Sequence, residues 1–251
     1  MTDALHNPNV LPDGLPVPQD DGAARHLRGT RLPDIELMAT DGSAVSLARL
    51  KGRTLVYVYP RTGKPGQAML DGWDAIPGAR GCTPQSCGFR DHFAELKRLG
   101  VGQLYGLSTQ DTAYQREAVE RLHLPFSILS DEHLKLTRAL DLPTFTTSGM
   151  TLLKRMAWVI DDGVITHAFY PVFPPDRSAQ QVIDWLSGVQ VSTDRLEHRL
   201  EHLRRQHAGV GVVARAVIAA EQRERPDLRP AAVAECGSLE LAAQRPDGRL
   251  V

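Results

Sequence analysis

The segment Pro77-Gly-Ala-Arg-Gly-Cys-Thr-Pro-Gln-Ser-Cys-Gly-Phe-Arg-Asp91 contains two of the three cysteines in this chain of 251 residues, Cys82 and Cys87. It reads as the start of a helix, because Thr83 is a favoured N-cap residue and Pro84 fits the first helical position, where a missing N–H costs nothing. Apolar residues at 89, 93 and 96 then recur with the spacing of one helix face. The helix is expected to run to about Leu99, before Gly100 ends it.

This placement has a chemical consequence for Cys82. Unpaired backbone N–H groups and the positive end of the helix dipole favour an anion at a helix N-terminus. The thiolate is the nucleophilic form of cysteine, and nearby cations favour it further. Arg80 and Arg90 are the candidate cations close in sequence. The alternative interpretation is that the cysteines are small buried hydrophobic residues with no chemical role.

The spacing of five residues between the cysteines also matters. In an intact helix they would lie roughly 7.5 Å apart along the axis and about 140° apart around it. A disulfide needs Cα atoms within about 7 Å and side chains that face each other, so a Cys82–Cys87 bond would require the first turn to unwind. Such a pair suits a redox cycle better than a structural disulfide. No metal site is expected, because neither CxxC nor a regular Cys/His set is present.

The remaining pattern alternates between strands and helices. The Asp41-Gly42 turn predicts a hairpin over residues 32–47, and Asp161-Asp162-Gly163 predicts a second one over 156–170. Further strands are expected at 54–59, 103–108 and 126–129, and further helices at 112–122, 131–140 and 178–186. This order predicts an α/β fold.

Composition bounds the partners and the compartment. The formal net charge is −1 and no apolar run approaches the roughly 20 residues that span a bilayer, so neither nucleic acid nor a membrane is an expected partner. The first residues lack the basic and apolar regions of a secretory signal, and a reducing cytoplasm is the expected location. Residues 1–30 are predicted to be a proline-rich arm, 31–188 the domain, and 189–251 an extension that is helical at first and then poorly ordered.

Two motifs carry a resemblance to a known family. Tyr57-Val-Tyr-Pro60 followed by Gly81-Cys-Thr-Pro-Gln-Ser-Cys-Gly-Phe-Arg-Asp91 resembles the peroxiredoxin superfamily, most closely the bacterioferritin-comigratory-protein or PrxQ group, over about residues 30–188. The resemblance implies a thioredoxin-like fold with a central mixed sheet flanked by helices. It also implies that Cys82 is the peroxidatic cysteine and Cys87 the resolving cysteine, that Pro60 shields the thiol, and that Arg155 supplies positive charge. A hydroperoxide substrate, a thioredoxin-like reductant and no bound cofactor follow from the same resemblance.

The chain departs from the family pattern in two places. Position 79 is alanine where the pattern has threonine or serine, and 21 residues separate Pro60 from Cys82 where the pattern has a much shorter connection. We expect this insertion, residues 61–81, to fold over Cys82, with the Thr62 or Thr83 hydroxyl replacing the missing one. Trp73 is expected to pack within it, and Trp73, Arg80 and Arg90 are candidates for contacting substrate. The alternative is a surface insertion without a role.

The preferred function is a thiol peroxidase that passes through a Cys82 sulfenic acid and a Cys82–Cys87 disulfide. Two rivals share these residues: a non-enzymatic redox sensor or scaffold, and a general thiol–disulfide oxidoreductase, for which the usual CxxC is absent. The expected helix at 192–203 presents leucines on one face and is a candidate for homodimer formation. Cys236 is interpreted as an incidental thiol.

Overall fold

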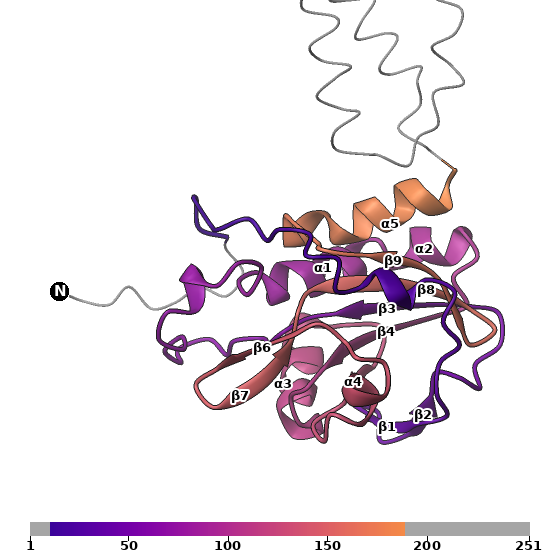
Figure 1. Ribbon diagram of the computed structural model, residues 1–251, viewed down its shortest axis with the longest axis horizontal. Coiled ribbons are helices and arrows are strands. Elements are labelled where there is room, and N and C mark those ends of the chain that lie inside the picture. Colours follow the sequence, from indigo (N-terminus) through magenta and orange to yellow (C-terminus); the bar gives the residue numbers. More distant parts are fainter. Residues whose placement is uncertain (1–10, 189–251) are drawn as a thin grey trace, which may run out of the picture. The chain divides into compact units, whose positions relative to one another are not determined.

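The computed structural model describes residues 11–188 (Figure 1). The predictions for residues 1–10, for the helix at 192–203, for Cys236 and for a homodimer contact lie outside the described residues. The predicted domain limits at residues 30 and 188 stay predictions.

A seven-stranded mixed sheet forms the centre, in the order β2-β1-β5-β4-β3-β8-β9. Strands β3, β4 and β5 are parallel, whereas the pairs β1–β2, β1–β5, β3–β8 and β8–β9 are antiparallel. The strands are β1 Glu36–Ala39, β2 Ala44–Ser46, β3 Arg53–Val58, β4 Gln103–Ser108, β5 Ile128–Ser130, β8 Met156–Asp161 and β9 Val164–Phe169. The predicted α/β fold with a central mixed sheet is thereby confirmed, including both predicted hairpins.

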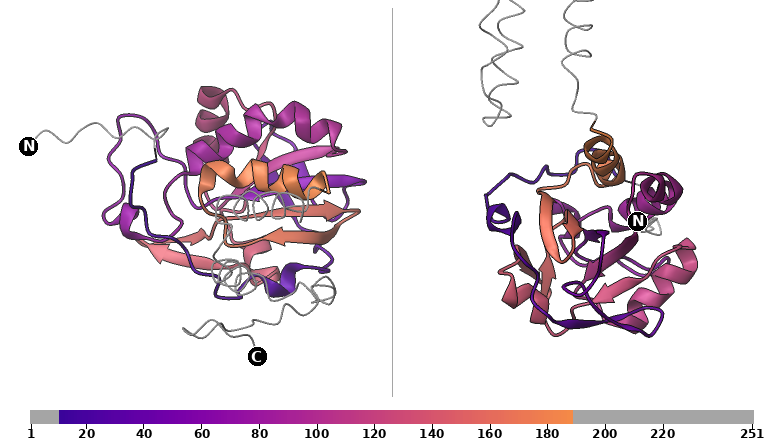
Figure 2. Two further views of the ribbon diagram at one scale, coloured as in Figure 1. Left: turned by 90° about the horizontal axis from the view of Figure 1, so that it is seen from above. Right: turned by 90° about the vertical axis from the view of Figure 1, so that its right-hand side faces the viewer.

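The helices are α1 Cys82–Asp91, α2 Phe93–Arg98, α3 Thr112–Leu122, α4 Lys135–Ala139 and α5 Ser178–Leu186, with 3₁₀ turns η1 Arg25–Leu27, η2 Trp73–Ala75 and η3 Pro175–Arg177. Helix α5 lies next to α1, as both figures of the whole domain show (Figures 1 and 2). Asp111 caps α3 by accepting a hydrogen bond from the Tyr114 N–H.

The core has two halves, one on each face of the sheet, and β3 contributes to both because its side chains alternate. Leu55 and Tyr57 belong to the half that contains α1, α2 and α5. Val56 and Val58 belong to the other half, where α4 and the fully buried Leu27 pack. The end of β3 therefore sits directly under α1, which carries both cysteines.

Two expectations about local structure are wrong, and one pair of strands was missed. Helix α1 begins at Cys82 instead of after Thr83, because Gly81 adopts φ +98° and turns the chain into the helix earlier. The expected single helix up to Leu99 is divided at His92, whose backbone at φ −96°, ψ 9° is not helical and whose ring pairs with Glu95 in the first turn of α2. The sequence prediction also missed a two-stranded sheet, β6 Thr144–Thr147 and β7 Met150–Leu153.

Candidate active site

Gly81 fixes where α1 begins. A Cβ atom at this position would lie 2.3 Å from Pro175 Cγ and 2.8 Å from Leu11 Cδ2, and the φ of +98° is one that L side chains rarely adopt. Only glycine fits both the backbone and the space. The first hydrogen bond of the helix runs from the Gln85 N–H to the Gly81 carbonyl at 3.0 Å. The N–H groups of Cys82 and Thr83 come before Gln85 in the chain, so they have no acceptor within the helix.

The sulfur of Cys82 contacts the guanidinium of Arg155. Cys82 is only 3% exposed, and Arg155 Nη2 donates to its Sγ at 3.3 Å. The thiol in turn donates to the Ala79 carbonyl at 3.6 Å. Arg155 is the residue just before β8, so the sheet brings together two residues that are 73 positions apart in sequence.

Arg155 is itself held by the end of the insertion. Its Nε and Nη2 donate to the carbonyls of Gly78, Ala79 and Arg80 at 2.9–3.3 Å. Its Nη1 donates to Gln85 Oε1 within α1, and the Gln85 amide donates to Ser178 Oγ at the start of α5 at 3.2 Å. With five donors in a rigid fork, a 3% exposed arginine is thus satisfied almost entirely by protein groups.

Cys87 has different surroundings, one and a half turns further along α1. It is half-buried against the apolar half of the core under α1. Burial raises the pKa of its thiol above the ordinary value, and the positive charge of Arg90 acts in the opposite direction. Arg90, a predicted neighbour of Cys82, instead influences Cys87, and it donates to Asp91 and to the Leu122 carbonyl.

Neither predicted hydroxyl bonds to the Cys82 sulfur. Thr62 Oγ1 donates to Gln110 Oε1 at 3.1 Å, and its backbone N–H bonds to the same oxygen at 3.0 Å. Thr83 is buried at 2% exposure, yet no hydrogen bond joins its side chain to Sγ among the described residues. The acceptor that lies at position 79 is the backbone carbonyl of Ala79, which can accept a hydrogen bond from the thiol but cannot donate one to a thiolate. Pro60 lies two residues after the end of β3 and is buried.

The insertion forms a small core of its own. Trp73 is 3% exposed and packs with Ala79 and Leu152, and its ring lies 6.2 Å from that of Phe145 in β6. The alanine at position 79 therefore fills space in this core. Arg80 pairs with Asp74 of the insertion at 2.9 Å and makes no hydrogen bond to Cys82 through its side chain. The assignment of Trp73 and Arg80 as substrate contacts stays a prediction.

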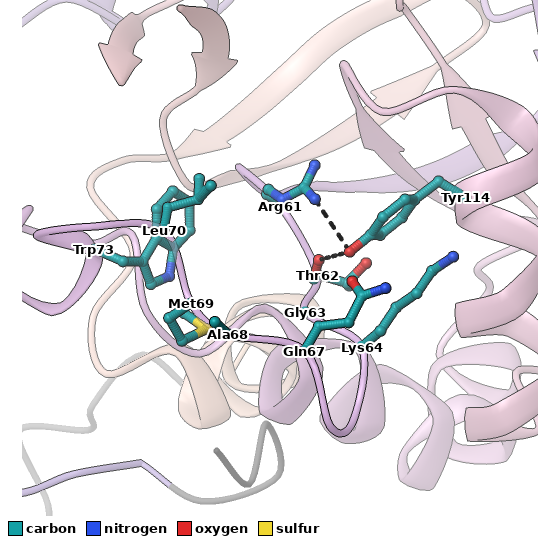
Figure 3. Close-up of a pocket in the computed structure, with 10 residues that line it drawn as sticks. All are labelled: Arg61, Thr62, Gly63, Lys64, Gln67, Ala68, Met69, Leu70, Trp73 and Tyr114. Carbon is teal, nitrogen blue, oxygen red and sulfur yellow. Dashed lines mark hydrogen bonds between the residues drawn. The ribbon is translucent and has the colours of Figure 1, made fainter. Parts of the chain in front are cut away.

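A cationic cleft lies where the insertion leaves the sheet (Figure 3). Arg61 and Lys64 both approach the Tyr114 ring, at 4.6 and 4.3 Å from its centroid. The Tyr114 hydroxyl accepts from Arg61 and donates to the Thr62 carbonyl. Figure 3 shows Met69, Leu70 and Trp73 on the opposite side of the cleft. The contacts of Tyr114 attach the first turn of the insertion to α3.

A larger cavity of about 360 Å³ is lined in part by the end of the insertion. Its lining is mostly apolar, and it includes Ile76, Phe145 and Val172. Arg155 and Gly78 also line it, so Arg155 is shared between this cavity and the sulfur of Cys82. Asp21 lies at its rim, bonded to Lys154 at 2.6 Å and to the Tyr170 hydroxyl at 2.8 Å.

Sequence reasoning missed the polar residues on the buried face of α1. Gln85 and Ser86 are both 0% exposed, and Ser86 accepts from the hydroxyl of Tyr57 at 3.1 Å. Polar residues in a helix usually face water, so a hydrophobic pattern gives no sign of them. In the sequence, only the position of Gln85 and Ser86 between the two cysteines could have indicated that these polar side chains belong to the site.

Comparison with known proteins assigns the family. The family model described as Redoxin matches residues 27–183. The chain belongs to the redoxin family. Two curated relatives are peroxiredoxin Bcp of Escherichia coli (strain K12), 32% identical over 63% of this chain and 94% of the relative, and chloroplastic peroxiredoxin Q of Oryza sativa subsp. japonica, 31% identical over 64% and 67%.

Solved structures with the same fold are also peroxiredoxins. Peroxidoxin BcpB from Mycobacterium tuberculosis has a TM-score of 0.51 at 23% identity and covers 65% of this chain and 97% of its own. PrxQ from Xylella fastidiosa, solved as a cysteine-to-serine mutant, has a TM-score of 0.51 at 17% identity, covering 64% and 95%. The predicted peroxiredoxin family and thioredoxin-like fold are confirmed, and this redoxin is a thiol-dependent peroxidase by class.

Two further features concern the described residues alone. No helix between residues 11 and 188 is long and apolar enough to cross a membrane. Within the same range, no group of three or more histidine, cysteine or acidic side chains is arranged to hold a metal ion.

Proposed function

We propose that Cys82 reduces hydroperoxides and that Cys87 resolves the product. The Cys82 thiolate attacks the terminal peroxide oxygen, the O–O bond breaks, and the leaving alkoxide or hydroxide takes a proton, which yields a sulfenic acid and an alcohol or water. The Cys87 thiolate then attacks the sulfenic sulfur, so that a disulfide forms and hydroxide leaves, to be protonated to water. A dithiol protein of the thioredoxin type then reduces the Cys82–Cys87 disulfide by thiol–disulfide exchange. Both thiols are restored, and the partner is left with a disulfide.

The contact between Arg155 and Cys82 is the observation that carries this proposal. Negative charge develops on the leaving oxygen, and preorganised donors aimed at it lower the barrier. Arg155 Nη2, 3.3 Å from Sγ, supplies one donor beside the sulfur. The two N–H groups at the start of α1, which have no acceptor within the helix, are further donors on the same side.

Resolution requires α1 to change shape. Cys82 and Cys87 both lie within the unbroken helix Cys82–Asp91. Five residues of helix separate their Cα atoms by roughly 7.5 Å along the axis and turn the side chains about 140° apart, beyond the reach of a disulfide. We infer that the first turn unwinds after oxidation, and that Cys87 reaches Cys82 in this minor conformation.

The cavity beside Arg155 supports organic hydroperoxides as substrates in addition to hydrogen peroxide. A volume of about 360 Å³ with a mostly apolar lining suits an apolar body of moderate size. The hydroperoxide group would reach the arginine, which the cavity shares with Cys82. A reducing compartment such as the cytoplasm would keep the dithiol partner reduced.

Stopped-flow tryptophan fluorescence tests the proposal directly. The reduced protein is mixed with hydrogen peroxide or cumene hydroperoxide, beside the variants Cys82→Ser and Cys87→Ser. We expect a peroxide-dependent phase that only Cys82→Ser abolishes and a later, peroxide-independent phase that Cys87→Ser also abolishes. Dimedone should trap the sulfenic acid in Cys87→Ser. Oxidation no faster than that of a free thiol would contradict the proposal and would favour the redox-sensor interpretation.

A further inference from the structure

A chain of buried hydrogen bonds connects the sheet to the carbonyl of Cys82. Tyr57 of β3 donates from its hydroxyl to Ser86 Oγ at 3.1 Å, and Ser86 Oγ donates to the Cys82 carbonyl oxygen at 3.0 Å. Tyr57 and Ser86 are each 0% exposed. The chain therefore begins on a rigid strand and ends on the residue whose sulfur reacts.

Its location sets it apart from the contacts of Arg155. The hydrogen bonds of Arg155 hold the end of the insertion and Gln85. The hydrogen bonds from Tyr57 to Ser86 and from Ser86 to the Cys82 carbonyl instead hold the peptide unit of Cys82, from one helical turn further along α1. Ser86 immediately precedes Cys87 and lies one turn after Cys82. Any unwinding that brings the two cysteines together must move Ser86 away from the Cys82 carbonyl.

Moving Ser86 away from the Cys82 carbonyl costs free energy at Tyr57. The phenol is fully buried, and desolvation raises its pKa well above the ordinary value, so it stays a neutral donor. Its ring stacks on Phe89 at 4.6 Å between centroids and meets Phe126 edge-on at 5.8 Å, so packing keeps the hydroxyl in place. When Ser86 leaves, the Tyr57 hydroxyl loses its partner in an apolar site, which costs more than an ordinary exchange with water.

We propose that Tyr57, acting through Ser86, is a positioning residue that holds α1 in its folded form and thereby sets the rate at which Cys87 resolves the sulfenic acid. This inference rests on the proposed function. While α1 stays folded, the sulfur of the Cys82 sulfenate can attack a second hydroperoxide. The O–O bond then breaks, the leaving alkoxide or hydroxide takes a proton, and a sulfinic acid and an alcohol or water result. The hydrogen-bond chain therefore sets the partition between the disulfide and overoxidation.

The test compares the two kinetic phases in Tyr57→Phe. This change keeps the ring and its stacking and removes only the hydroxyl. Resolution through a minor unwound form scales with the population of that form, so we expect the peroxide-independent phase to become about 5- to 150-fold faster, the range of one buried hydroxyl left without a partner. The peroxide-dependent phase should change by less than about 2-fold. The peroxide concentration that gives half sulfinic acid, measured by mass spectrometry, should rise by the same factor as the resolution rate.

Tyr59→Phe is the matched control. Tyr59 is also 0% exposed and lies two residues further along the chain, but its hydroxyl makes no hydrogen bond to α1. Removing it should leave the resolution rate unchanged. Equal acceleration in both variants would mean that losing a buried hydroxyl loosens the core in general, and this would overturn the assignment to Tyr57.

Ser86→Ala provides a second route to the same chain. It leaves the Tyr57 hydroxyl unpaired in the folded form, so resolution should accelerate at least as much as in Tyr57→Phe. Adding Tyr57→Phe to Ser86→Ala should then produce no further acceleration, because both changes break the same chain. Unchanged resolution in both single variants overturns this inference while the wild-type phases still support the proposed function. A wild-type reaction without a Cys87-dependent phase would instead contradict the proposed function itself.

Discussion

The two cysteines share one helix of ten residues but occupy opposite kinds of environment. Cys82 is 3% exposed, and its sulfur is fixed between the guanidinium of Arg155 and the carbonyl of Ala79. Cys87 is half-buried against apolar side chains, and no hydrogen bond to its sulfur occurs within residues 11–188. The first sulfur is held by polar contacts from two segments, whereas the second is restrained only by packing.

This difference matches two different chemical tasks. Attack on a peroxide needs reacting atoms and charged donors in fixed positions, because an error of about 1 Å can cost two orders of magnitude in rate. Resolution needs a side chain that can leave its site at moderate cost. The fixed contacts around Cys82 and the apolar contacts around Cys87 therefore divide the proposed cycle into a rigid half and a mobile half.

Loss of Arg155 should have the largest effect, confined to the rigid half. We expect Arg155→Met to slow peroxide oxidation of Cys82 by about 10²- to 10³-fold, as for removal of one charge-stabilising donor. Arg155→Lys should fall between this variant and the wild type, because lysine keeps the charge but not the fork that reaches three carbonyls. The measurement is the rate of the peroxide-dependent fluorescence phase.

Arg90→Gln is the matched control, because Arg90 lies near Cys87 and makes no contact with the Cys82 sulfur. Its oxidation rate should stay within about 2-fold of the wild type, since a distant, partly solvated charge contributes little. Equal losses in both variants would show that general positive charge matters and that the specific contact at Sγ does not. Circular dichroism of Arg155→Lys separates a loss of chemistry from a loss of folding.

The glycines that flank the cysteines provide the next comparison. Gly81→Ala introduces a Cβ that would meet Pro175 at 2.3 Å, at a φ of +98°. We expect it to lower the free energy of unfolding by about 2–4 kcal/mol through backbone strain and overpacking. Gly88 has an ordinary helical φ, and a Cβ there would approach the Asp176 carbonyl at 3.3 Å. Gly88→Ala should lie within about 1 kcal/mol of the wild type, because helix propensity offsets the tight contact.

Urea denaturation of both variants measures these differences. Similar losses in the free energy of unfolding for Gly81→Ala and Gly88→Ala would contradict the view that the backbone is rigidly fixed only where α1 begins, at Cys82. Gly88→Ala should also slow the Cys87-dependent phase, since alanine favours the helix that must unwind.

The sequence predicted the elements that have strong local signals. The Asp41-Gly42 and Asp162-Gly163 turns and the apolar run of β3 all appear in the structure where expected. The β6–β7 hairpin was missed although Ser148 and Gly149, both with positive φ, form its turn. Its strands are short and half-buried, with no alternation of apolar and polar residues, so the usual period of two was absent.

The missing parts of the site have a different cause. Three consecutive backbone carbonyls hold Arg155, and a carbonyl is present at every residue, so sequence carries no sign of which ones converge. The resemblance directed attention to a hydroxyl near position 79, whereas the structure uses a backbone oxygen and an alanine side chain that packs against Trp73. Tertiary contacts decided both features.

The cavity beside Arg155 allows the rigid half to be tested with substrates of different size. Val17 lines this cavity and is 56% exposed, so a larger side chain fits there without disturbing the core. We expect Val17→Phe to lower kcat/KM for cumene hydroperoxide by about 10-fold, the order of a poor fit in an apolar pocket. kcat/KM for hydrogen peroxide should not change. A parallel decrease for both peroxides would indicate a general effect on Cys82 and would remove the cavity from the substrate path.

The smallest expected effect concerns the charge state of Cys87. Burial raises the pKa of this thiol and Arg90 lowers it, so Arg90→Gln should raise the pKa further. In the Cys82→Ser background, iodoacetamide should therefore alkylate Cys87 about 2- to 5-fold more slowly at pH 8 after Arg90→Gln, the order of one charge pair near a surface. The difference should vanish at high pH, where the thiolate is fully formed in both proteins.

The same pKa shift links the resolution step to pH. Because the folded pKa of Cys87 is raised, burial of the neutral thiol stabilises α1 below the pKa of an unfolded cysteine, and this contribution is lost as pH rises above it. Resolution should then accelerate with alkalinity for two reasons: more Cys87 thiolate and an α1 that unwinds more readily. A resolution rate that is independent of pH between about 7 and 10 would contradict the assignment of Cys87 to the mobile half.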